Sequence, residues 1–340
     1  MRLEKSGVGR AFIAAGCLLF MIGPARADDD QACRVAEGEE AIAACTRLIA
    51  SDDKNVLAYE SRGLAFYKQN KHTEAIADLD VTVKLRPQVA NGYYNRALAY
   101  AALGRNAEAL AGYTKAIDIE PANVGARYGR AIVRYVEGDY PQALTGYTAV
   151  IQIDPKYANA YLGRGITYQA MKKYELAIAN YSTTLFLDPR NAQALVNRGD
   201  CESERHDYVL AIDDFHRALD LGSNDLAAWI GLGYTETQAG HPDLGLAAND
   251  KALAIDPADP TALNNRAYSL LKLGRPADGM PDIEKAIALS PKLAANYETR
   301  AELYEALGKP ALAIADYKSA LALGEKVDSV KALKRLKAIR

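Results

Sequence analysis

Residues 90–121 read ANGYYNRALAYAALGRNAEALAGYTKAIDIEP, and residues 124–155 read VGARYGRAIVRYVEGDYPQALTGYTAVIQIDP. The second stretch repeats the first, and the chain matches itself eight times at the interval that separates them. A fixed period of this length indicates a repeat architecture. Small residues occupy two places in every copy, always with the same spacing between them. The first column is Gly63, Ala97, Ala131, Gly165, Gly199, Gly233, Ala267 and Ala301, and the second is Ala75, Ala109, Ala143, Ala177, Ala211, Gly245, Gly279 and Ala313.

Each copy has the pattern of a helical hairpin. Small residues at matching places let two helices cross closely, because larger side chains would hold the backbones apart. Apolar residues keep helical spacing between these places, as at Tyr93, Ala97 and Tyr100. Glycine marks the break between the two helices in five copies, and proline marks the end of the second helix in six. The breaks are Gly104, Gly138, Gly240, Gly274 and Gly308, and the ends are Pro87, Pro121, Pro155, Pro189, Pro257 and Pro291.

A hairpin of about 34 residues with stretches such as YYNRA at 93–97 and AIANY at 177–181 resembles the tetratricopeptide repeat (TPR) of bacterial exported proteins. The resemblance covers residues 56 to about 325. It implies an all-α fold, a right-handed superhelical solenoid of tandem helix-turn-helix hairpins whose first helices line a concave wall. We expect eight repeats within residues 56–327, starting near residues 56, 90, 124, 158, 192, 226, 260 and 294.

Residues 1–27 have the features of a secretory signal peptide. Basic residues precede an apolar run at 11–23, and Ala-Arg-Ala at 25–27 is a small-x-small cleavage signature. The apolar run would span only about 20 Å as a helix, which is less than the bilayer core. We therefore predict a protein that is secreted across the inner membrane, periplasmic, and not an integral membrane protein. Cleavage removes four Lys/Arg and one Glu and changes the formal charge from −2 to −5, which disfavours nucleic acid as a partner.

Residues 28–55 are expected to form an N-terminal half-repeat cap. On one straight helix Cys33 and Cys45 would lie about 18 Å apart, too far for a bridge. Two short helices folded back at the Glu37-Gly38 turn would bring them together. An oxidising compartment favours a disulfide there, and two buried thiols are the alternative.

Residues 328–340 are expected to form a C-terminal capping helix with an apolar face and a basic face. We expect the basic face to pair with Glu298, Glu302 and Glu305 of the last hairpin. A peripheral contact with anionic membrane lipid is the weaker alternative.

The sequence lacks the patterns that catalysis requires. The four histidines are scattered without zinc-type spacing, and no phosphate loop, serine elbow or dinucleotide glycine cluster is present. We predict that the protein is not an enzyme and takes no cofactor and no metal.

An arginine precedes the first small-residue column in most copies. Such a row could bind phosphate or carboxylate groups. Four of these hairpins also carry an aspartate at one fixed place in the second helix, however, which favours an internal pair across the two helices. The arginines are Arg62, Arg96, Arg130, Arg164, Arg198, Arg266 and Arg300, and the aspartates are Asp78, Asp214, Asp282 and Asp316.

Two further columns on the first helices contain residues that hairpin packing does not require. By the TPR resemblance, this face lines the concave groove. Copies two to four are apolar and tyrosine-rich there, and the last copy is acidic, so a ligand that is apolar or aromatic at one end and basic at the other would match. The alternative is that these side chains pack against the neighbouring hairpin. The predicted partner-binding groove consists of Tyr94, Leu98, Tyr128, Ile132, Tyr135, Leu162, Ile166, Val196, Ile230, Tyr234, Tyr268, Glu298 and Glu302.

Two functional hypotheses follow. The first is a non-enzymatic scaffold or adaptor of the cell envelope that binds a peptide segment or a partner protein in this groove. The alternative is a carbohydrate-associated scaffold for envelope polysaccharide assembly or export, because tyrosine faces also stack on sugar rings.

Overall fold

The computed structural model describes residues 24–222, 225–324 and 328–336, without the side chains of residues 24–27 and 328. These residues form nineteen helices and no strand. The helices are α1 (Pro24–Val35), α2 (Gly38–Ser51), α3 (Val56–Lys68), α4 (His72–Leu85), α5 (Ala90–Ala102), α6 (Asn106–Ile119), α7 (Val124–Val136), α8 (Tyr140–Ile153), α9 (Ala158–Ala170), α10 (Tyr174–Leu187), α11 (Ala192–Glu204), α12 (Tyr208–Asp220), α13 (Leu226–Gln238), α14 (Pro242–Ile255), α15 (Pro260–Lys272), α16 (Pro276–Leu289), α17 (Ala294–Ala306), α18 (Pro310–Ala322) and α19 (Asp328–Arg335).

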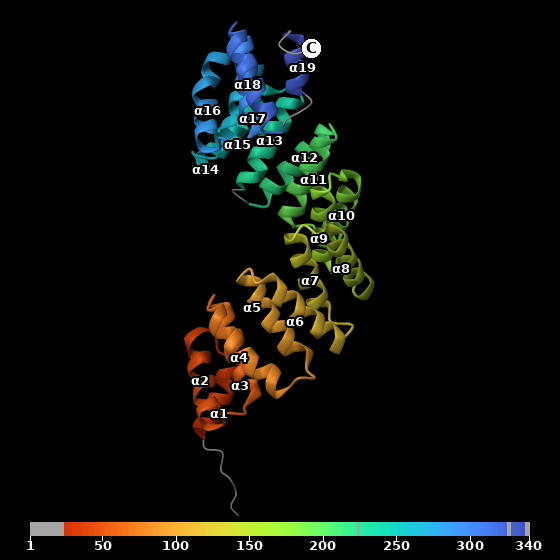
Figure 1. Cartoon of the computed structure of the whole chain (residues 1–340), viewed down its shortest axis with the longest axis vertical. Helices are drawn as coiled ribbons and strands as arrows, with labels where there is room; N and C mark the ends of the chain where they lie inside the picture. The colour runs from red at the N-terminus through yellow and green to blue at the C-terminus, as the bar shows by residue number, and fades with distance from the viewer. Residues whose placement is uncertain (1–23, 223–224, 325–327, 337–340) are drawn as a thin grey trace, which may run out of the picture. The chain divides into compact units, whose positions relative to one another are not determined.

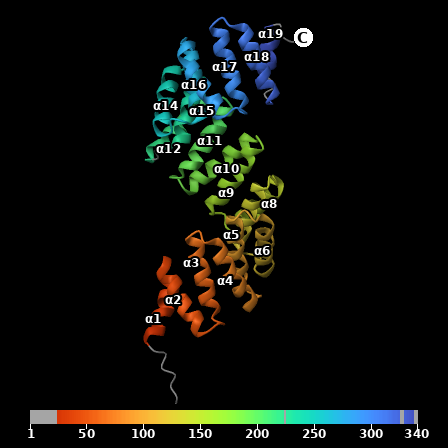
Figure 2. The ribbon, with the colours of Figure 1, turned by 60° about the vertical axis from the view of Figure 1, so that its left-hand side comes forward.

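The chain divides into two compact units, the N-terminal unit of residues 1–126 and the C-terminal unit of residues 127–340. Helices α1–α6 belong to the first unit and α8–α19 to the second, and the boundary falls inside α7. Within each unit, successive helices pack as antiparallel hairpins, which can be followed along the colour gradient in Figures 1 and 2. The eight odd-numbered helices from α3 to α17 begin at the positions where the sequence period places the repeat starts.

The hairpins close because small residues stand where the two helices cross. A Cβ added to Gly165 of α9 would lie 2.7 Å from the Tyr181 ring of α10, and one added to Gly233 of α13 would overlap with Oδ1 of Asn249 on α14. Both contacts are closer than van der Waals packing allows. The turn between the helices also requires a left-handed residue, and Gly104 takes φ +70° there.

The first helices of neighbouring hairpins form one layer. In the C-terminal unit, α9 packs against α11, α11 against α13, α13 against α15 and α15 against α17, and in the N-terminal unit α3 packs against α5. The second helix of a hairpin packs against the first helix of the next, as α10 does against α11. The core lies between these layers and includes Tyr181 and Phe215, both fully buried. The outer face of the first-helix layer is therefore continuous within a unit.

The N-terminal cap consists of α1 and α2, which fold back on each other at Gly38 with φ +63°. This turn brings the Cα atoms of Cys33 and Cys45 to 4.8 Å, and the two residues form a disulfide within a small core that includes Leu48 and Ala58. The predicted signal peptide lies outside the described residues up to residue 23, and α1 runs across the predicted cleavage point after Ala27. Among the described helices, none combines the length and apolar character needed to span a membrane.

The arginine column forms the predicted internal pairs. Arg62, Arg198, Arg266 and Arg300 each donate two hydrogen bonds, of 2.6–2.8 Å, to the aspartate at the fixed place in the second helix. Arg164 finds Asn180 at that place and donates a hydrogen bond of 2.7 Å to its Oδ1. Arg96 pairs with Asp80 on the preceding helix instead, because Gly112 stands at the usual acidic position.

The C-terminal cap is α19, which packs against α18. Leu333 is fully buried and Ala332 is 8% exposed, so the apolar side of the helix seals the last hairpin. Arg335 forms an ion pair of 2.6 Å with Glu305 of α17, as the charge pattern predicts, and Ser329 donates a hydrogen bond of 3.3 Å to Glu298. The predicted helix continues to residue 340, but residues 337–340 lie outside the described part.

Candidate functional site

The predicted groove residues of the N-terminal unit are half-buried. Tyr94 packs its ring 6.2 Å from that of Tyr113 and lies against Gly125, where a Cβ would be 3.0 Å from the Tyr94 ring. Leu98, one turn further along α5, is also partly exposed. Tyr94 therefore packs against its neighbours and still presents part of its ring to solvent.

At the start of the C-terminal unit, the predicted groove residues differ in exposure. Tyr128 is partly buried between the rings of Tyr147 and Tyr157, at 5.8 and 5.3 Å, and burial raises its pKa. Ile132 is 38% exposed, whereas Tyr135 is partly covered and packs in the core of the α7–α8 hairpin. Ile132 is the residue of this group that is most open to a ligand.

Residues in the middle of the predicted groove are more deeply buried than the sequence indicates. Val196 is 5% exposed and packs with Leu195 and Leu185, so it is a core residue and is removed from the candidate site. Its core cluster combines residues from α10 to α14, which the column pattern alone does not reveal. Leu162, Ile166 and Ile230 are partly buried along core clusters and keep part of their surface.

Three pockets follow one another along the first-helix layer of the C-terminal unit. The first, of about 430 Å³, lies between α9, α11 and α13, and the second, of about 280 Å³, lies between α13, α15 and α17. The third, of about 730 Å³, lies between α15, α17 and α19. Tyr234 lines the first two pockets, and Glu298 and Glu302 line the last two. The shared residues make the three pockets one row, which we call the pocket row.

The first pocket holds acidic groups that the predicted site did not include. It is lined by Asp200 and Glu204 of α11 and by Tyr174 and Tyr234. Desolvation raises the pKa of Asp200 to about 7, and the nearby charges of Glu204 and Asp225 add to the effect. Asp200 stands in one of the two groove columns, where the preceding copies carry leucine or isoleucine. That break in the column is the signal from which sequence reasoning could have found it.

The second pocket presents amide side chains beside aromatic ones. It is lined by Asn264, Asn265 and Tyr268 of α15 and by Tyr234 of α13. Asn265 donates a hydrogen bond of 3.4 Å to the Ile230 carbonyl, but the buried Oδ1 of Asn264 accepts none within the described residues. A buried amide oxygen without a donor is costly, so a ligand donor that reached this atom would offset the cost.

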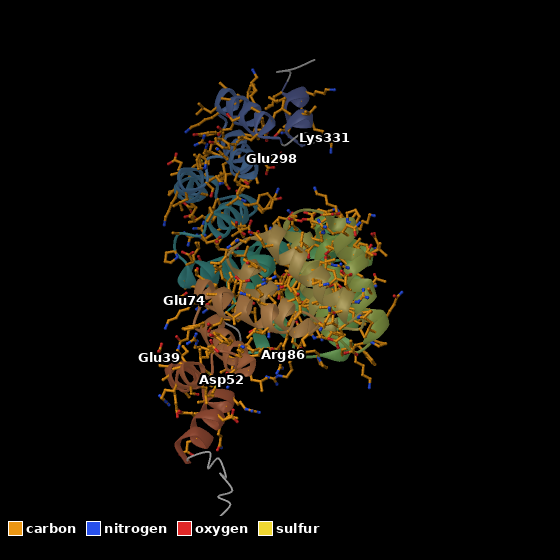
Figure 3. The ribbon with its side chains drawn as sticks, turned by 60° about the horizontal axis from the view of Figure 1, so that its bottom comes forward. Glu39, Asp52, Glu74, Arg86, Glu298 and Lys331 are labelled. Atoms are coloured by element: carbon orange, nitrogen blue, oxygen red, sulfur yellow. A yellow bond between two sulfur atoms is a disulfide. The ribbon has the colours of Figure 1, made fainter. Side chains whose placement is uncertain are left out.

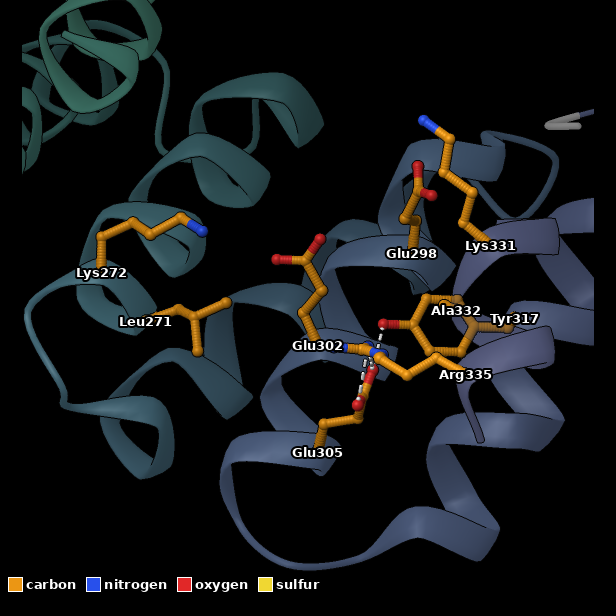
Figure 4. Close-up of a pocket in the computed structure, with 9 residues that line it drawn as sticks. All are labelled: Leu271, Lys272, Glu298, Glu302, Glu305, Tyr317, Lys331, Ala332 and Arg335. Carbon is orange, nitrogen blue, oxygen red and sulfur yellow. Dashed lines mark hydrogen bonds and ion pairs between the residues drawn. The ribbon is translucent and has the colours of Figure 1, made fainter. Parts of the chain in front are cut away.

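The third pocket is lined by three carboxylates and three cations, and two of the cations come from the basic face of the capping helix, where the sequence predicts them. The glutamates Glu298, Glu302 and Glu305 come from α17, and they meet Lys272 of α15 and Lys331 and Arg335 of α19. Figure 3 labels Glu298 and Lys331 on their two helices, and Figure 4 shows Glu302 between Lys272 on one side and Glu298 with Lys331 on the other. Glu305 is occupied by Arg335 and by the Tyr317 hydroxyl at 2.6 Å. The capping helix therefore supplies two of the three cations that offset this acidic cluster, and α15 supplies the third.

The arrangement is suited to binding an extended polar segment along the row. It offers aromatic faces, an amide acceptor and carboxylates in succession. The described residues contain no group of three or more His, Cys, Asp and Glu side chains placed to hold a metal ion.

Two kinds of repeat model match the sequence over most of its length. Models described as tetratricopeptide repeat match residues 90–123, 162–225, 203–262 and 264–328. A model described as TPR repeat matches residues 63–104 and 133–172. No curated protein matches the chain.

Solved structures share the fold at low sequence identity. A tetratricopeptide repeat protein from Parabacteroides merdae superposes with a TM-score of 0.62 at 23% identity, over 74% of this chain and 99% of that one. PilW, a type IV pilus biogenesis factor, gives 0.55 at 21% identity over 63% of this chain and 99% of its own. PilF of Pseudomonas aeruginosa gives 0.57 at 16% identity over 63% and 98%.

Proposed function

The chain belongs to the tetratricopeptide repeat family, whose members bind protein or peptide partners, and on that premise we propose that it is a non-enzymatic adaptor of the periplasm that holds an extended peptide segment in the pocket row. The partner is a segment of another envelope protein.

The unpaired Oδ1 of Asn264 is the observation that carries this proposal. The atom is buried and accepts no hydrogen bond within the described residues, and Asn264 is one of the residues that line the second pocket. The backbone of an extended peptide offers an N–H donor at every residue except proline, and such donors satisfy a fixed side-chain acceptor without regard to sequence. Tyr234 beside it is 38% exposed and offers an aromatic face for a side chain of the same segment.

The periplasmic location rests on two features at the N-terminus. The first is the basic, apolar and small-residue pattern of residues 1–27. The second is the Cys33–Cys45 disulfide of the N-terminal cap, because structural disulfides persist in oxidising compartments. Cell fractionation with thiol labelling tests this: a cytoplasmic protein with two reactive thiols in the cap would contradict the location.

The test of binding is affinity capture from an envelope extract with the full chain, beside an Asn264→Ala, Tyr234→Ala double variant. Neither substitution empties the core, since Asn264 and Tyr234 are both partly exposed. The matched control is Leu210→Ala on α12, a 57%-exposed leucine on a second helix. Circular dichroism confirms that all variants are folded.

We expect proteins that the wild type and Leu210→Ala retain and the double variant loses. Equal capture by all three would place the binding surface outside the pocket row. If no protein is retained but envelope oligosaccharides quench the tyrosine fluorescence of the wild type, the carbohydrate-scaffold alternative replaces the adaptor.

A further inference from the structure

We propose that the first pocket of the row, between α9, α11 and α13, is a subsite for a cationic side chain, a lysine or arginine of the bound segment, which Asp200 and Glu204 hold against the Tyr234 ring. This subsite rests on the proposed function, because it specifies one residue of the peptide that the row binds.

The walls of the pocket come from three neighbouring hairpins. The C-terminal ends of α9 and α11 contribute Gln169, Ala170, Ser203 and Glu204, and α13 contributes Gly231, Tyr234 and Thr235. A Cβ on Gly231 would lie 2.5 Å from the buried Phe215 ring and 3.3 Å from Oδ1 of Asp200, so only glycine fits there and the space beside the carboxylate stays open. The ends of α9 and α11 carry the partial negative charge of the helix dipole, which favours a cation.

Asp200 is the one carboxylate of this pocket without a partner in the described residues. It accepts no hydrogen bond and forms no ion pair there, whereas Glu204 accepts a hydrogen bond of 3.4 Å from Tyr174, and Ser203 and Thr235 bond to each other at 2.9 Å. Burial and two negative neighbours raise its pKa to about 7. An incoming ammonium or guanidinium would supply the missing counter-charge and donors, and charge-assisted hydrogen bonds are the strongest of their kind.

The charges around the pocket distinguish a cation from other ligands. An anion would meet Asp200 and Glu204 with the one lining cation, Lys172, which is exposed at the rim and is not among the groups that shift the pKa of Asp200. A neutral apolar side chain would cover Asp200 without giving it a partner. A lysine or arginine both pairs with the carboxylate and stacks on Tyr234, whose ring is 38% exposed.

The test measures the binding of the full chain to immobilised pools of capped nonapeptides. The central residue is fixed as Lys, Arg, norleucine, citrulline or Glu, and the other positions are random mixtures of non-ionisable residues. The variants are Asp200→Asn, which keeps the shape of the side chain, and Asp213→Asn as control, because Asp213 is 68% exposed on α12 and does not line the pocket. Urea midpoints confirm that both variants are folded.

We expect the wild type and Asp213→Asn to bind the Lys and Arg pools at least about ten-fold more tightly than the norleucine and citrulline pools, and Asp200→Asn to reduce that ratio below about three-fold. Binding without a preference for the cationic pools overturns the subsite and leaves the proposed function standing. A preference for the cationic pools that persists in Asp200→Asn also overturns the subsite, because the cation would then bind elsewhere. If no pool binds, the peptide-binding function fails, and the subsite fails with it.

Discussion

Replacing Asp214 with alanine and with asparagine should give very different losses of stability. Asp214 of α12 is 1% exposed and accepts two hydrogen bonds from Arg198 of α11, at 2.6 and 2.7 Å. Alanine would leave the Arg198 guanidinium, whose side chain is 18% exposed, without its main counter-charge. Uncompensated buried charges are among the most destabilising changes in proteins.

The stability that Asp214→Ala loses depends on the groups that remain around Arg198. Removing one partner of a buried pair costs about 3–5 kcal/mol. Glu202 lies 3.8 Å from Arg198, and its pKa, which burial raises to about 7, would fall once the Asp214 charge is gone. Ser182 also accepts a hydrogen bond of 2.9 Å from Arg198. These groups offset part of the loss, so we expect about 3 kcal/mol for Asp214→Ala.

The preceding hairpin indicates why asparagine should be tolerated. There Asn180 accepts a hydrogen bond of 2.7 Å from Arg164 and donates one of 2.7 Å to the Leu176 carbonyl, one turn back on its helix. In Asp214→Asn the new amide side chain can make the same two bonds, with Arg198 and the Leu210 carbonyl. We expect a loss of about 1 kcal/mol, from the missing charge alone.

Urea unfolding followed by circular dichroism measures these losses, with hydrogen exchange of α11 and α12 because repeat proteins can unfold in parts. Asp213→Ala is the control, since Asp213 is 68% exposed and should cost less than about 0.5 kcal/mol. If asparagine were as harmful as alanine, or if alanine at position 214 cost no more than the control, Asp214 would not be the buried counter-charge of Arg198.

Three further results are expected. Changing Cys33 and Cys45 to serine should cost about 2–3 kcal/mol, seen as faster hydrogen exchange confined to the N-terminal cap; unchanged exchange would contradict a stabilising role. In the folded protein the pKa of Asp200 is about 7, which is above its value in the unfolded chain, so the folded protein binds this proton more tightly. The contribution of Asp200 to stability therefore falls as the pH rises from about 4 to 7. Asp200 is partly exposed, so solvent screening reduces the size of this effect. We expect Asp200→Asn to be more stable than the wild type by about 2 kcal/mol at pH 8 and equal to it near pH 4. Paired urea titrations at the two pH values measure the difference, and a difference that does not change with pH would contradict this expectation. Gly165→Ala should cost about 2 kcal/mol of stability and Gly199→Ala less than about 1 kcal/mol. The added Cβ would lie 2.7 Å from the facing ring in the first variant and 3.1 Å from it in the second. Equal urea midpoints for the two variants would contradict the requirement for small residues where the helices cross.

The repeat pattern predicted pairings that lie within one hairpin. The aspartate at the fixed place in the second helix meets the arginine of the first in all four hairpins that carry both. Cys33 and Cys45 meet for the same kind of reason, because a short turn fixes the distance between them. Arg96 departs from the pattern where the acidic position holds glycine, and it takes its partner from the preceding helix.

Exposure within the groove was not predictable in the same way. Val196 and Ile132 stand in the two groove columns, yet the first is 5% exposed and the second 38%. The difference depends on how the neighbouring hairpin covers each residue, and that hairpin is one full repeat away in the sequence. In the third pocket the cations of the capping helix were predicted to meet the glutamates of α17, but the contribution of Lys272 from α15 was not.

The hairpins, their period, their crossing points and their internal ion pairs could be predicted from the sequence, because they depend on contacts within one repeat that local spacing specifies. Stacking of the hairpins determines which groove side chains remain open, and it leaves Asp200 without a partner, among the described residues, in a pocket made by three hairpins. Burial and electrostatic surroundings are sums over neighbours from several repeats, and those neighbours are brought together only when the hairpins stack.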